Sequence, residues 1–343
     1  MDDDRTVAEL ASVWVWVMSK SLPTEYETVD ERLEVLESLP LPKAAVERFL
    51  KNIGVRVPTK DDSFFLKVAE LLDTDQFAEL VRQHKYAGRQ TMNYFIITGI
   101  SNFDLEEIES EVDSRLPKET DVEGVPQEPF LAESERFSSR LYLAIGYNEN
   151  AGSENPVTGK KMPLLITKRV VVVIRENSDL VTIRGSDVKM VEQIRDEVCR
   201  ALGKYRDVVK QRPEMGPEFQ EKFNELVELY YNLKVRVDDQ PDSTLDTISF
   251  TSKEDETGNR RDAREDGRVE KELNERGGEI TMGYVQLEEG LRFRLNREEA
   301  KLSFMKSENE ENLNSVTEVV DRVLRETGKY PQEQISGIKD VPE

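Results

Sequence analysis

The sequence is poor in the residues that most often carry out catalysis. It has one cysteine, Cys199, and one histidine, His84, among 343 residues. A single cysteine excludes an intramolecular disulfide and a cysteine-ligated zinc site. Cys199 lies in an apolar helical pattern, where we expect a buried structural thiol rather than a nucleophile. A His-based triad would need His84 beside a nucleophile and a carboxylate, and no nucleophile motif accompanies it.

Other signatures of enzymes are missing as well. The glycines Gly146, Gly152 and Gly159 are scattered, and none opens a helix after a strand, so the sequence has no phosphate-binding loop. Carboxylates are abundant, but their spacing does not match a calcium loop. We therefore expect a protein that is not an enzyme and that holds no cofactor and no metal. An enzyme built on His84 and several carboxylates is kept as a third hypothesis.

Long hydrophobic runs are absent too. The most apolar early stretch, Ala8 to Met18, is too short to span a membrane. Asp2, Asp3 and Asp4 occupy the positions where a secretory signal would carry positive charge. We therefore expect a cytoplasmic protein without membrane contact.

Negative charge is what the sequence has in excess. Asp and Glu number 70 against 48 Lys and Arg, and the net charge is −22. Such a charge opposes general attraction to nucleic acid or anionic lipid, although a local basic patch can still bind either. One explanation, which we favour, is a halophilic cytoplasm; the other is an ordinary acidic protein with acidic linkers. In molar salt the Debye length is about 3 Å, so any nucleic-acid contact would depend on close fit.

Composition and periodicity divide the chain into six segments. The expected order is a helical domain at 1–116, a linker at 117–136, a first β-β-β-α repeat with an extra helix at 137–235, a charged and partly disordered insertion at 236–277, a second β-β-β-α repeat at 278–331, and a flexible tail at 332–343. Inside the first segment, Met92 to Ile100 fits a strand or a helix. The extra helix is expected at Pro217 to Leu233, because its apolar residues share one helical face.

The two repeats match element by element. Their first strands end in Gly146-Tyr147 and Gly283-Tyr284. The matches at the helix ends, all 125 residues apart, are Asp196 with Asp321, Val198 with Val323, Arg200 with Arg325, Gly203 with Gly328, Lys204 with Lys329 and Tyr205 with Tyr330. A unit used twice predicts one shared antiparallel sheet with its helices on one face, which makes the fold α+β behind an all-helical N-terminal domain. The other face would then be free to bind.

Two local basic groups stand out against the acidic background. The first comprises Arg82, Lys85 and Arg89 in the helical domain, next to His84. The second comprises Lys160, Lys161, Lys168 and Arg169 around the long loop of the first repeat. One hypothesis is that these residues contact the phosphates of a nucleic acid. The alternative is that they pair with nearby acids.

The order of elements resembles a known family. A helical domain is followed by a strand with the sequence Arg140 to Tyr147, a long polar loop and the strand Arg169 to Ile174. These stretches are similar to strands of the centromere protein N family, inner-kinetochore proteins that bind a centromeric nucleosome and partner with a related subunit. The similarity covers residues 1–205, and the remainder only in its order of elements. No binding residue of that family can be carried over, and the acidic balance departs from that of a nucleosome binder.

These features predict a binding protein rather than an enzyme. The first hypothesis is a protein associated with DNA or chromosomes that uses the duplicated sheet and the basic hairpin. The second is a protein–protein adaptor or self-assembling scaffold without nucleic-acid contact, in which the open sheet face or the Pro217–Leu233 helix engages a protein partner or a second copy.

Overall fold

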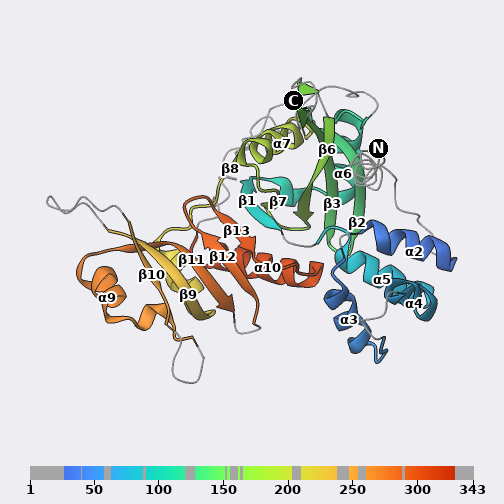
Figure 1. Cartoon of the computed structure of the whole chain (residues 1–343). Coiled ribbons are helices and arrows are strands. Elements are labelled where there is room, and N and C mark those ends of the chain that lie inside the picture. Colours follow the sequence, from blue (N-terminus) through green and yellow to red (C-terminus); the bar gives the residue numbers. More distant parts are fainter. Residues whose placement is uncertain are drawn as a thin grey trace, which may run out of the picture.

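The computed structural model describes residues 27–39, 41–57, 63–87, 90–119, 128–150, 153–154, 161–162, 165–202, 210–237, 247–253, 260–287 and 290–328. The predicted tail at 332–343 lies outside them. A group of helices is followed by a large antiparallel sheet with further helices packed on it (Figure 1). The α+β class with a helical N-terminal part is thus confirmed. None of the described helices is long and apolar enough to cross a membrane.

The N-terminal helices form a small body with its own core. They are α2 (Val29–Ser38), α3 (Lys43–Asn52), α4 (Phe64–Leu71) and α5 (Thr74–His84). Two of them begin at capping boxes, because Thr28 exchanges hydrogen bonds with Glu31, and Asp73 does so with Gln76. Their apolar sides meet in one cluster, centred on fully buried residues such as Phe64 and Phe77. Burial of this shared core stabilises helices that are too short to persist alone.

One antiparallel sheet holds the rest of the chain together. Its strands are β1 (Thr91–Ile97), β2 (Phe130–Phe137), β3 (Arg140–Asn150), β6 (Leu165–Arg175), β7 (Leu180–Arg184), β8 (Lys210–Gln211), β9 (Val227–Arg236), β10 (Thr247–Thr251), β11 (Glu279–Leu287), β12 (Arg292–Asn296) and β13 (Lys301–Phe304). They lie in the order β10-β9-β11-β12-β13-β1-β7-β6-β3-β2, and the short β8 also pairs with β1. The strands β4 (Ser153–Glu154) and β5 (Lys161–Met162) form a separate pair.

Strand β1 lies at the centre of this sheet, so the predicted helical domain at 1–116 is too long. Of the two alternatives for Met92 to Ile100, the strand is found, and α5 is the last helix of the N-terminal body. Helix α6 (Leu105–Arg115) packs on the sheet with Ile108 and Val112 buried. The predicted linker at 117–136 also contains most of β2, which pairs along β3.

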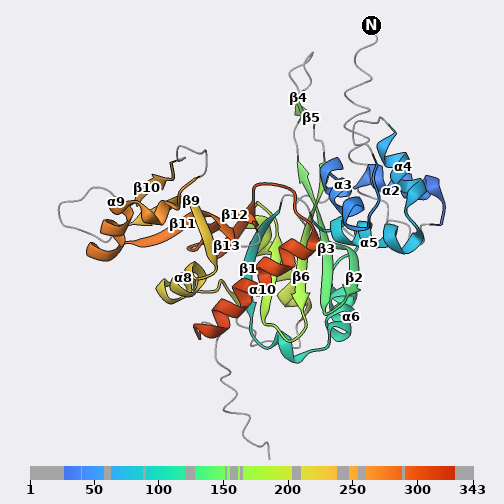
Figure 2. The ribbon, with the colours of Figure 1, turned by 90° about the horizontal axis from the view of Figure 1, so that it is seen from below.

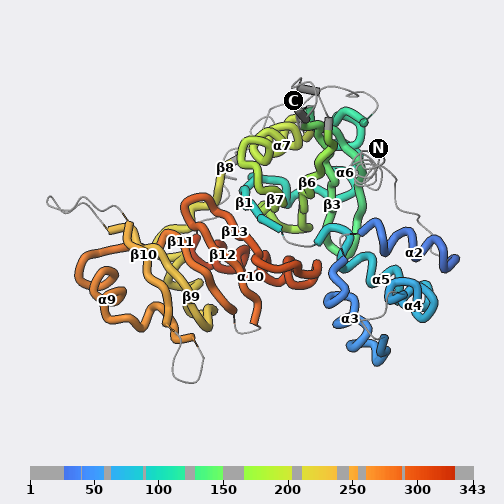
Figure 3. The backbone as a smooth tube through the Cα atoms, viewed as in Figure 1, coloured from blue at the N-terminus to red at the C-terminus, as the bar shows by residue number. Residues whose placement is uncertain are grey.

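The repeat is visible as two matching halves on either side of β1 (Figure 3). One half consists of β3, β6, β7 and α7 (Val188–Ala201), and the other of β11, β12, β13 and α10 (Glu310–Glu326). Strand order is the same in each, and the helices end 125 residues apart, at Ala201 and Glu326. Both β7 and β13 run antiparallel to β1, and they are therefore parallel to each other.

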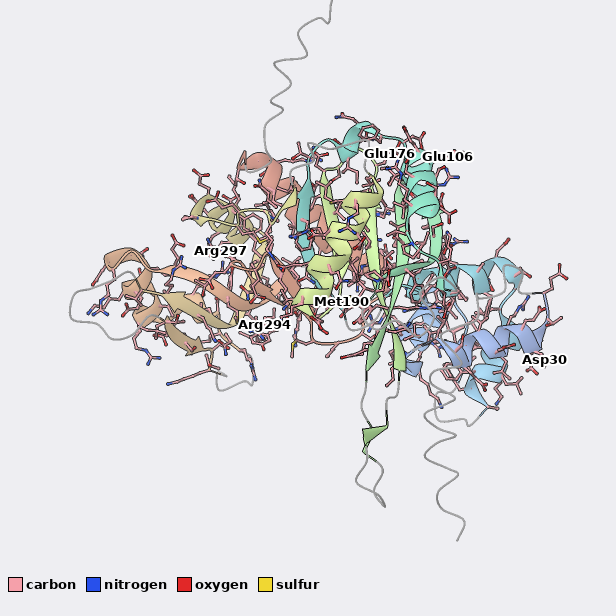
Figure 4. All side chains as sticks on the ribbon, turned by 90° about the horizontal axis from the view of Figure 1, so that it is seen from above. Asp30, Glu106, Glu176, Met190, Arg294 and Arg297 are labelled. Atoms are coloured by element: carbon pink, nitrogen blue, oxygen red, sulfur yellow. The ribbon has the colours of Figure 1, made fainter. Side chains whose placement is uncertain are left out.

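This arrangement corrects the expectation that the helices share one face. Helix α7 packs on the side of the sheet that carries Phe95 and Ile97, whereas α10 packs on the side that carries Met92 and Tyr94. Successive residues of a strand point to opposite faces, so the two helices lie on opposite sides. Figure 2, seen from below, has α10 in front of the sheet, and Figure 4, seen from above, has the helix of Met190 in front. The two halves lie on opposite edges of β1, and their strands next to β1, namely β7 and β13, run in the same direction. A rotation of 180° about the β1 axis therefore superimposes one half on the other, and this rotation places the two helices on opposite faces of the sheet.

The predicted helix at Pro217–Leu233 is also wrong. Helix α8 (Pro217–Asn224) stops early, and the chain continues as β9. Its buried residues Val227, Tyr230 and Leu233 recur every three positions and so imitate a helix. The cause is a pair of β-bulges, each of which inserts one extra residue into the strand.

The charged insertion predicted at 236–277 has ordered parts. It supplies β10, a 3-10 turn (Ala263–Glu265), α9 (Gly267–Glu270) and a π-helical turn (Lys271–Glu275). Ala263 and Val269 are buried in the core under β9. Residues 238–246 and 254–259 lie outside the described residues.

Candidate functional site

The basic group predicted in the helical body is tied up in ion pairs. Nζ of Lys85 lies 2.6 Å from a carboxylate oxygen of Glu133 and 2.7 Å from one of Glu135. Burial alone would lower the pKa of Lys85, but its hydrogen bonds to both carboxylates raise it above the ordinary value. Arg82 lies 2.6 Å from Glu79. These two cations therefore follow the alternative set out above, pairing with nearby acids.

The basic group predicted around the first hairpin does not form one surface. Lys168 pairs with Glu149, and this hydrogen bond raises the pKa of Lys168. Lys168 and Arg169 are successive residues of β6, so they point to opposite faces of the sheet. Lys161 lies in β5 opposite Glu154. Lys160 and Arg89 lie outside the described residues.

A different part of the sheet carries exposed basic and aromatic side chains. Strands β9, β11 and β12 bury one side against α8 and α10. The opposite side of these strands has no described helix on it (Figure 4, where Arg294 is labelled). On this open face lie Tyr231 from β9, Tyr284 from β11, and Arg292 and Arg294 from β12.

Tyr284 shows that one match of the repeat is out of phase. The sequence aligned Tyr284 with Tyr147, but Tyr147 packs into the core beneath α7. Tyr284 instead points away from α10, and the next residue, Val285, enters the core of its own half. A shift of one residue moves a strand side chain to the other face, so this pair of tyrosines is not equivalent.

A cleft of about 960 Å³ opens over this face. It is lined by Arg48, Tyr231, Asn232, Thr251, Arg260, Tyr284, Val285, Gly290, Leu291, Arg292, Phe293, Met305, Lys306, Glu308 and Asn312. We call it the arginine–tyrosine cleft. The strands β9, β11 and β12 form its floor, and it continues past their ends to the core-facing residues Val285 and Phe293 and to Asn312 in the first turn of α10. Arg48 comes from α3, and residues 305–308 come from the segment between β13 and α10.

The lining of the cleft is basic although the protein is acidic. Four cations and one carboxylate, Glu308, contribute to it. Arg48, Arg292 and Lys306 are exposed, and among the described residues none of the three forms an ion pair. Glu308 accepts a hydrogen bond from Asn312 at 2.7 Å. In a chain of net charge −22, this lining therefore forms a local surface that attracts anions.

Two arginines lie near the ring of Tyr231. The guanidinium of Arg292 lies 4.9 Å from the centre of the Tyr231 ring, and that of Arg260 lies 5.7 Å from it. Distances below about 6 Å are those of cation–π contacts. A similar pair forms beside it, where the Arg294 guanidinium lies 5.9 Å from the centre of the Tyr284 ring.

Gln286 fixes the orientation of this pair. Its Oε1 accepts a hydrogen bond from the Tyr231 hydroxyl and another, at 2.7 Å, from Nε of Arg292. Its Nε2 donates to Glu228 at 2.6 Å. The terminal Nη atoms of Arg292 have no hydrogen-bonding partner among the residues that the structure describes. The arginine is thus oriented through Nε, with its terminal donors available to an anion.

A β-bulge places Tyr231 on the open face. Tyr284 pairs with Asn232 and Val285 pairs with Tyr230, so Tyr231 is the extra residue of β9. Tyr230 points the other way into the core, and burial raises its pKa. Bulges redirect side chains and occur often next to functional sites.

A second cleft, of about 600 Å³, separates the helical body from the sheet. The lining includes five glutamates, at positions 79, 135, 310, 311 and 318. Its cations Arg82, Lys85 and Arg140 all form ion pairs. These ion pairs neutralise the three cations, and the carboxylates of the lining outnumber them. The second cleft is therefore unsuited to bind an anion.

His84 and Cys199 do not contribute to either cleft. His84 is buried at the end of α5, and burial together with the nearby charge of Arg48 lowers its pKa to about 4. Cys199 is half-buried and packs against the core beneath α7. Within the described ranges, no three His, Cys, Asp or Glu side chains are grouped so that they could hold a metal ion.

No protein-family model matches the sequence, and no curated protein matches it either.

The sequence contained one overlooked signal for the cleft. The run from Leu291 to Leu295 alternates apolar residues with Arg292 and Arg294, which predicts a strand with a basic outer face. The remaining cations, Arg48, Arg260 and Lys306, come from distant segments that only the fold brings together.

Proposed function

We propose that the protein is a non-enzymatic binding protein whose ligand is nucleic acid and whose binding surface is the arginine–tyrosine cleft. The observation that carries the proposal is the grouping of Arg48, Arg292 and Lys306, which form no ion pair with the described residues, beside two tyrosines on an open sheet face. Arginine and lysine contact phosphates, and aromatic rings contact bases. The basic hairpin is no longer the preferred surface, because Lys168 is paired and Arg169 points to the opposite face.

Three features support this ligand over a small metabolite. The cleft is open along the strands β9, β11 and β12, and its basic residues follow that floor and the adjoining wall. The charge contrast with the rest of the chain concentrates an anionic polymer at this surface. Fully buried carboxylates or histidines that would serve as acid and base are not part of the lining. The similarity to the centromere protein N family remains a prediction from the sequence, and the present proposal does not depend on it.

The test is binding of fluorescent DNA and RNA by the full chain, measured as anisotropy over a range of salt concentrations. The variant Arg292→Glu/Lys306→Glu reverses two cations of the cleft. We expect its affinity to fall by more than about tenfold, because both cations contribute to counterion release, and we expect the salt dependence to become weaker.

A matched control reverses two cations elsewhere. Arg200 and Lys222 are exposed, each pairs with a neighbouring glutamate, and neither lines the cleft. Arg200→Glu/Lys222→Glu makes the same change in net charge, and we expect affinity to stay within about twofold of the original, since exposed pairs contribute little. Equal losses in both variants, or no binding of any nucleic acid, would refute the proposal.

A protein–protein adaptor or self-assembling scaffold is the second candidate. The strands β10 and β2 end the described sheet, and each pairs with one neighbouring strand. Free strand edges can pair with another chain. The helix proposed earlier for this role is not one element, and Phe219 and Phe223 of α8 are buried. Light scattering of the purified protein tests self-assembly, and a monomer at all concentrations contradicts it.

A further inference from the structure

We propose that the arginine–tyrosine cleft selects single-stranded nucleic acid, with neighbouring bases stacked on Tyr231 and Tyr284. This inference rests on the proposed function and gives its ligand a chemical class. It follows from where the rings lie, how they are held and what the sheet can reach.

The two tyrosines lie close together on one face of the sheet. They come from neighbouring strands, which lie about 4.8 Å apart in a sheet. Tyr231 is next to Asn232, and Asn232 is the residue that pairs with Tyr284. The rings are thus diagonal neighbours on one face, at a separation that aromatic side chains can bridge. Sheets with aromatic residues on adjacent strands bind two or three unstacked bases in this manner.

The arginines extend this platform. A guanidinium is planar, stacks on rings and bases, and binds phosphate through its terminal donors. Arg292 combines these properties, because it lies against Tyr231 and its hydrogen bond to the described residues is made through Nε. Arg294 lies against Tyr284 in the corresponding position, with Nε directed to the sulfur of Met282 at 3.0 Å. Each tyrosine therefore contacts one arginine, and both arginines come from β12.

A duplex would not use this surface fully. Its bases are stacked inside, and its grooves admit a helix or a two-stranded ribbon. Here the rings are half-buried in the face of a wide sheet, where β9 to β13 lie side by side. They cannot enter a groove, so a duplex would contact the arginines alone. A single strand exposes its bases and engages the cations and the rings together.

The experiment compares the two kinds of strand and separates stacking from charge. The full chain is titrated against labelled DNA of about 12 nucleotides, a length within the range of known sheet-borne sites, as a single strand, as a duplex and as the matching RNA. Tyr231→Ala and Tyr284→Ala each remove a ring. Tyr231→Phe keeps the ring and removes the hydroxyl that Gln286 accepts from.

We expect tighter binding of the single strands than of the duplex. Each alanine variant should weaken single-strand binding by about 5- to 150-fold, the range seen when one stacked base is lost. The salt dependence should stay unchanged in these variants, because no phosphate contact is removed. Tyr231→Phe should stay within about threefold. Circular dichroism verifies that each variant is folded.

The outcomes separate the two proposals. If the duplex binds as tightly as the single strand, and the tyrosine variants bind normally while Arg292→Glu/Lys306→Glu does not, the cleft is a phosphate-binding surface and the selection for single strands is refuted. If no nucleic acid binds at any salt concentration, the proposed function fails and this inference fails with it. A preference between the DNA and RNA single strands is compatible with the inference and identifies the source of the strand, since the 2′-hydroxyl distinguishes them.

Discussion

A buried ion pair between Arg184 and Glu310 gives the most direct test of how the parts of the fold are held together. Arg184 ends β7, and Glu310 begins α10 of the other half. The pair is bidentate, with Nη1 bonded to Oε1 and Nη2 lying 2.9 Å from Oε2. Nη1 also donates to the backbone carbonyl of Tyr86 at 2.9 Å. One guanidinium therefore connects both halves of the sheet to the end of the helical body.

The magnitude follows from burial. The side chains of Arg184 and Glu310 are 1% and 9% exposed. Burial would lower the pKa of Arg184, but the Glu310 charge raises it, so the arginine stays charged when folded. Removal of one partner leaves the other charge buried and uncompensated, which costs about 3–5 kcal/mol of unfolding free energy. Replacement of both by apolar residues of similar volume costs much less, because no charge is left behind.

The assay is urea denaturation of a double-mutant cycle, followed by far- and near-ultraviolet circular dichroism. We expect Arg184→Met and Glu310→Leu each to lower the unfolding free energy by about 3–5 kcal/mol, and the double variant to recover at least about 3 kcal/mol of their sum. The exposed pair Arg236 and Glu298, 2.8 Å apart, is the control, and its single variants should cost about 1 kcal/mol or less. Single losses near 1 kcal/mol at Arg184, or additive losses, would refute this account of the pair.

Three further predictions concern single positions. The pKa of His84 is about 4 in the folded protein and about 6.5 in the unfolded chain. Between these pH values only the unfolded chain binds the proton, so the free energy of unfolding decreases as the pH falls from 6.5 towards 4. This loss amounts to about 2 kcal/mol by about pH 5, and His84→Gln should remove that part of the pH dependence in denaturation curves. A Cβ at Gly283 would lie 2.7 Å from the Tyr230 ring, so Gly283→Ala should lower the unfolding free energy by about 1–3 kcal/mol, whereas Gly267→Ala, with open space around it, should not. Lys168→Glu should leave nucleic-acid affinity within about twofold, because this cation is already neutralised by a partner; a larger loss in anisotropy titrations would restore the hairpin as a binding surface.

The sequence predicted correctly those helices and strands whose apolar residues follow a single period, either that of a helix or that of a strand. The alternation from Leu291 to Leu295 and the helical spacing of α7 and α10 were unambiguous, and the two helices end 125 residues apart, at Ala201 and Glu326. Of the six matches at the helix ends, those that involve Gly203, Lys204, Tyr205, Lys329 and Tyr330 lie outside the described residues. Prediction failed where local geometry hides the period. In β9, bulges space the buried residues by three, and the resulting pattern is that of a helix.

The location of the site was harder to predict for a different reason. Basic residues that lie close together in the sequence predicted a patch at Lys85 and at Lys168, but in the folded chain both pair with carboxylates. The cations of the cleft come from α3, the segment before Ala263, β12 and the segment before α10, between positions 48 and 306. Composition and periodicity give no indication that such distant positions meet. Which of these positions meet is determined by the pairing of the strands and by the 180° rotation that relates the two copies of the repeat.

The place of β1 has a consequence for the order in which the molecule is made. Residues 91–97 can pair with β7 as soon as the first half has been synthesised, and this closes one edge of β1. On its other edge, β8 pairs with Ile96 and Ile97, but Thr91 to Asn93 pair with β13 and stay open until Ser303, more than a hundred residues after the end of β7, has left the ribosome. Long-range pairing of this kind is slow and leaves an aggregation-prone edge during synthesis. We therefore expect the first half to assemble early as a template, and the second half, with its cleft, to form only when the last strand and α10 arrive.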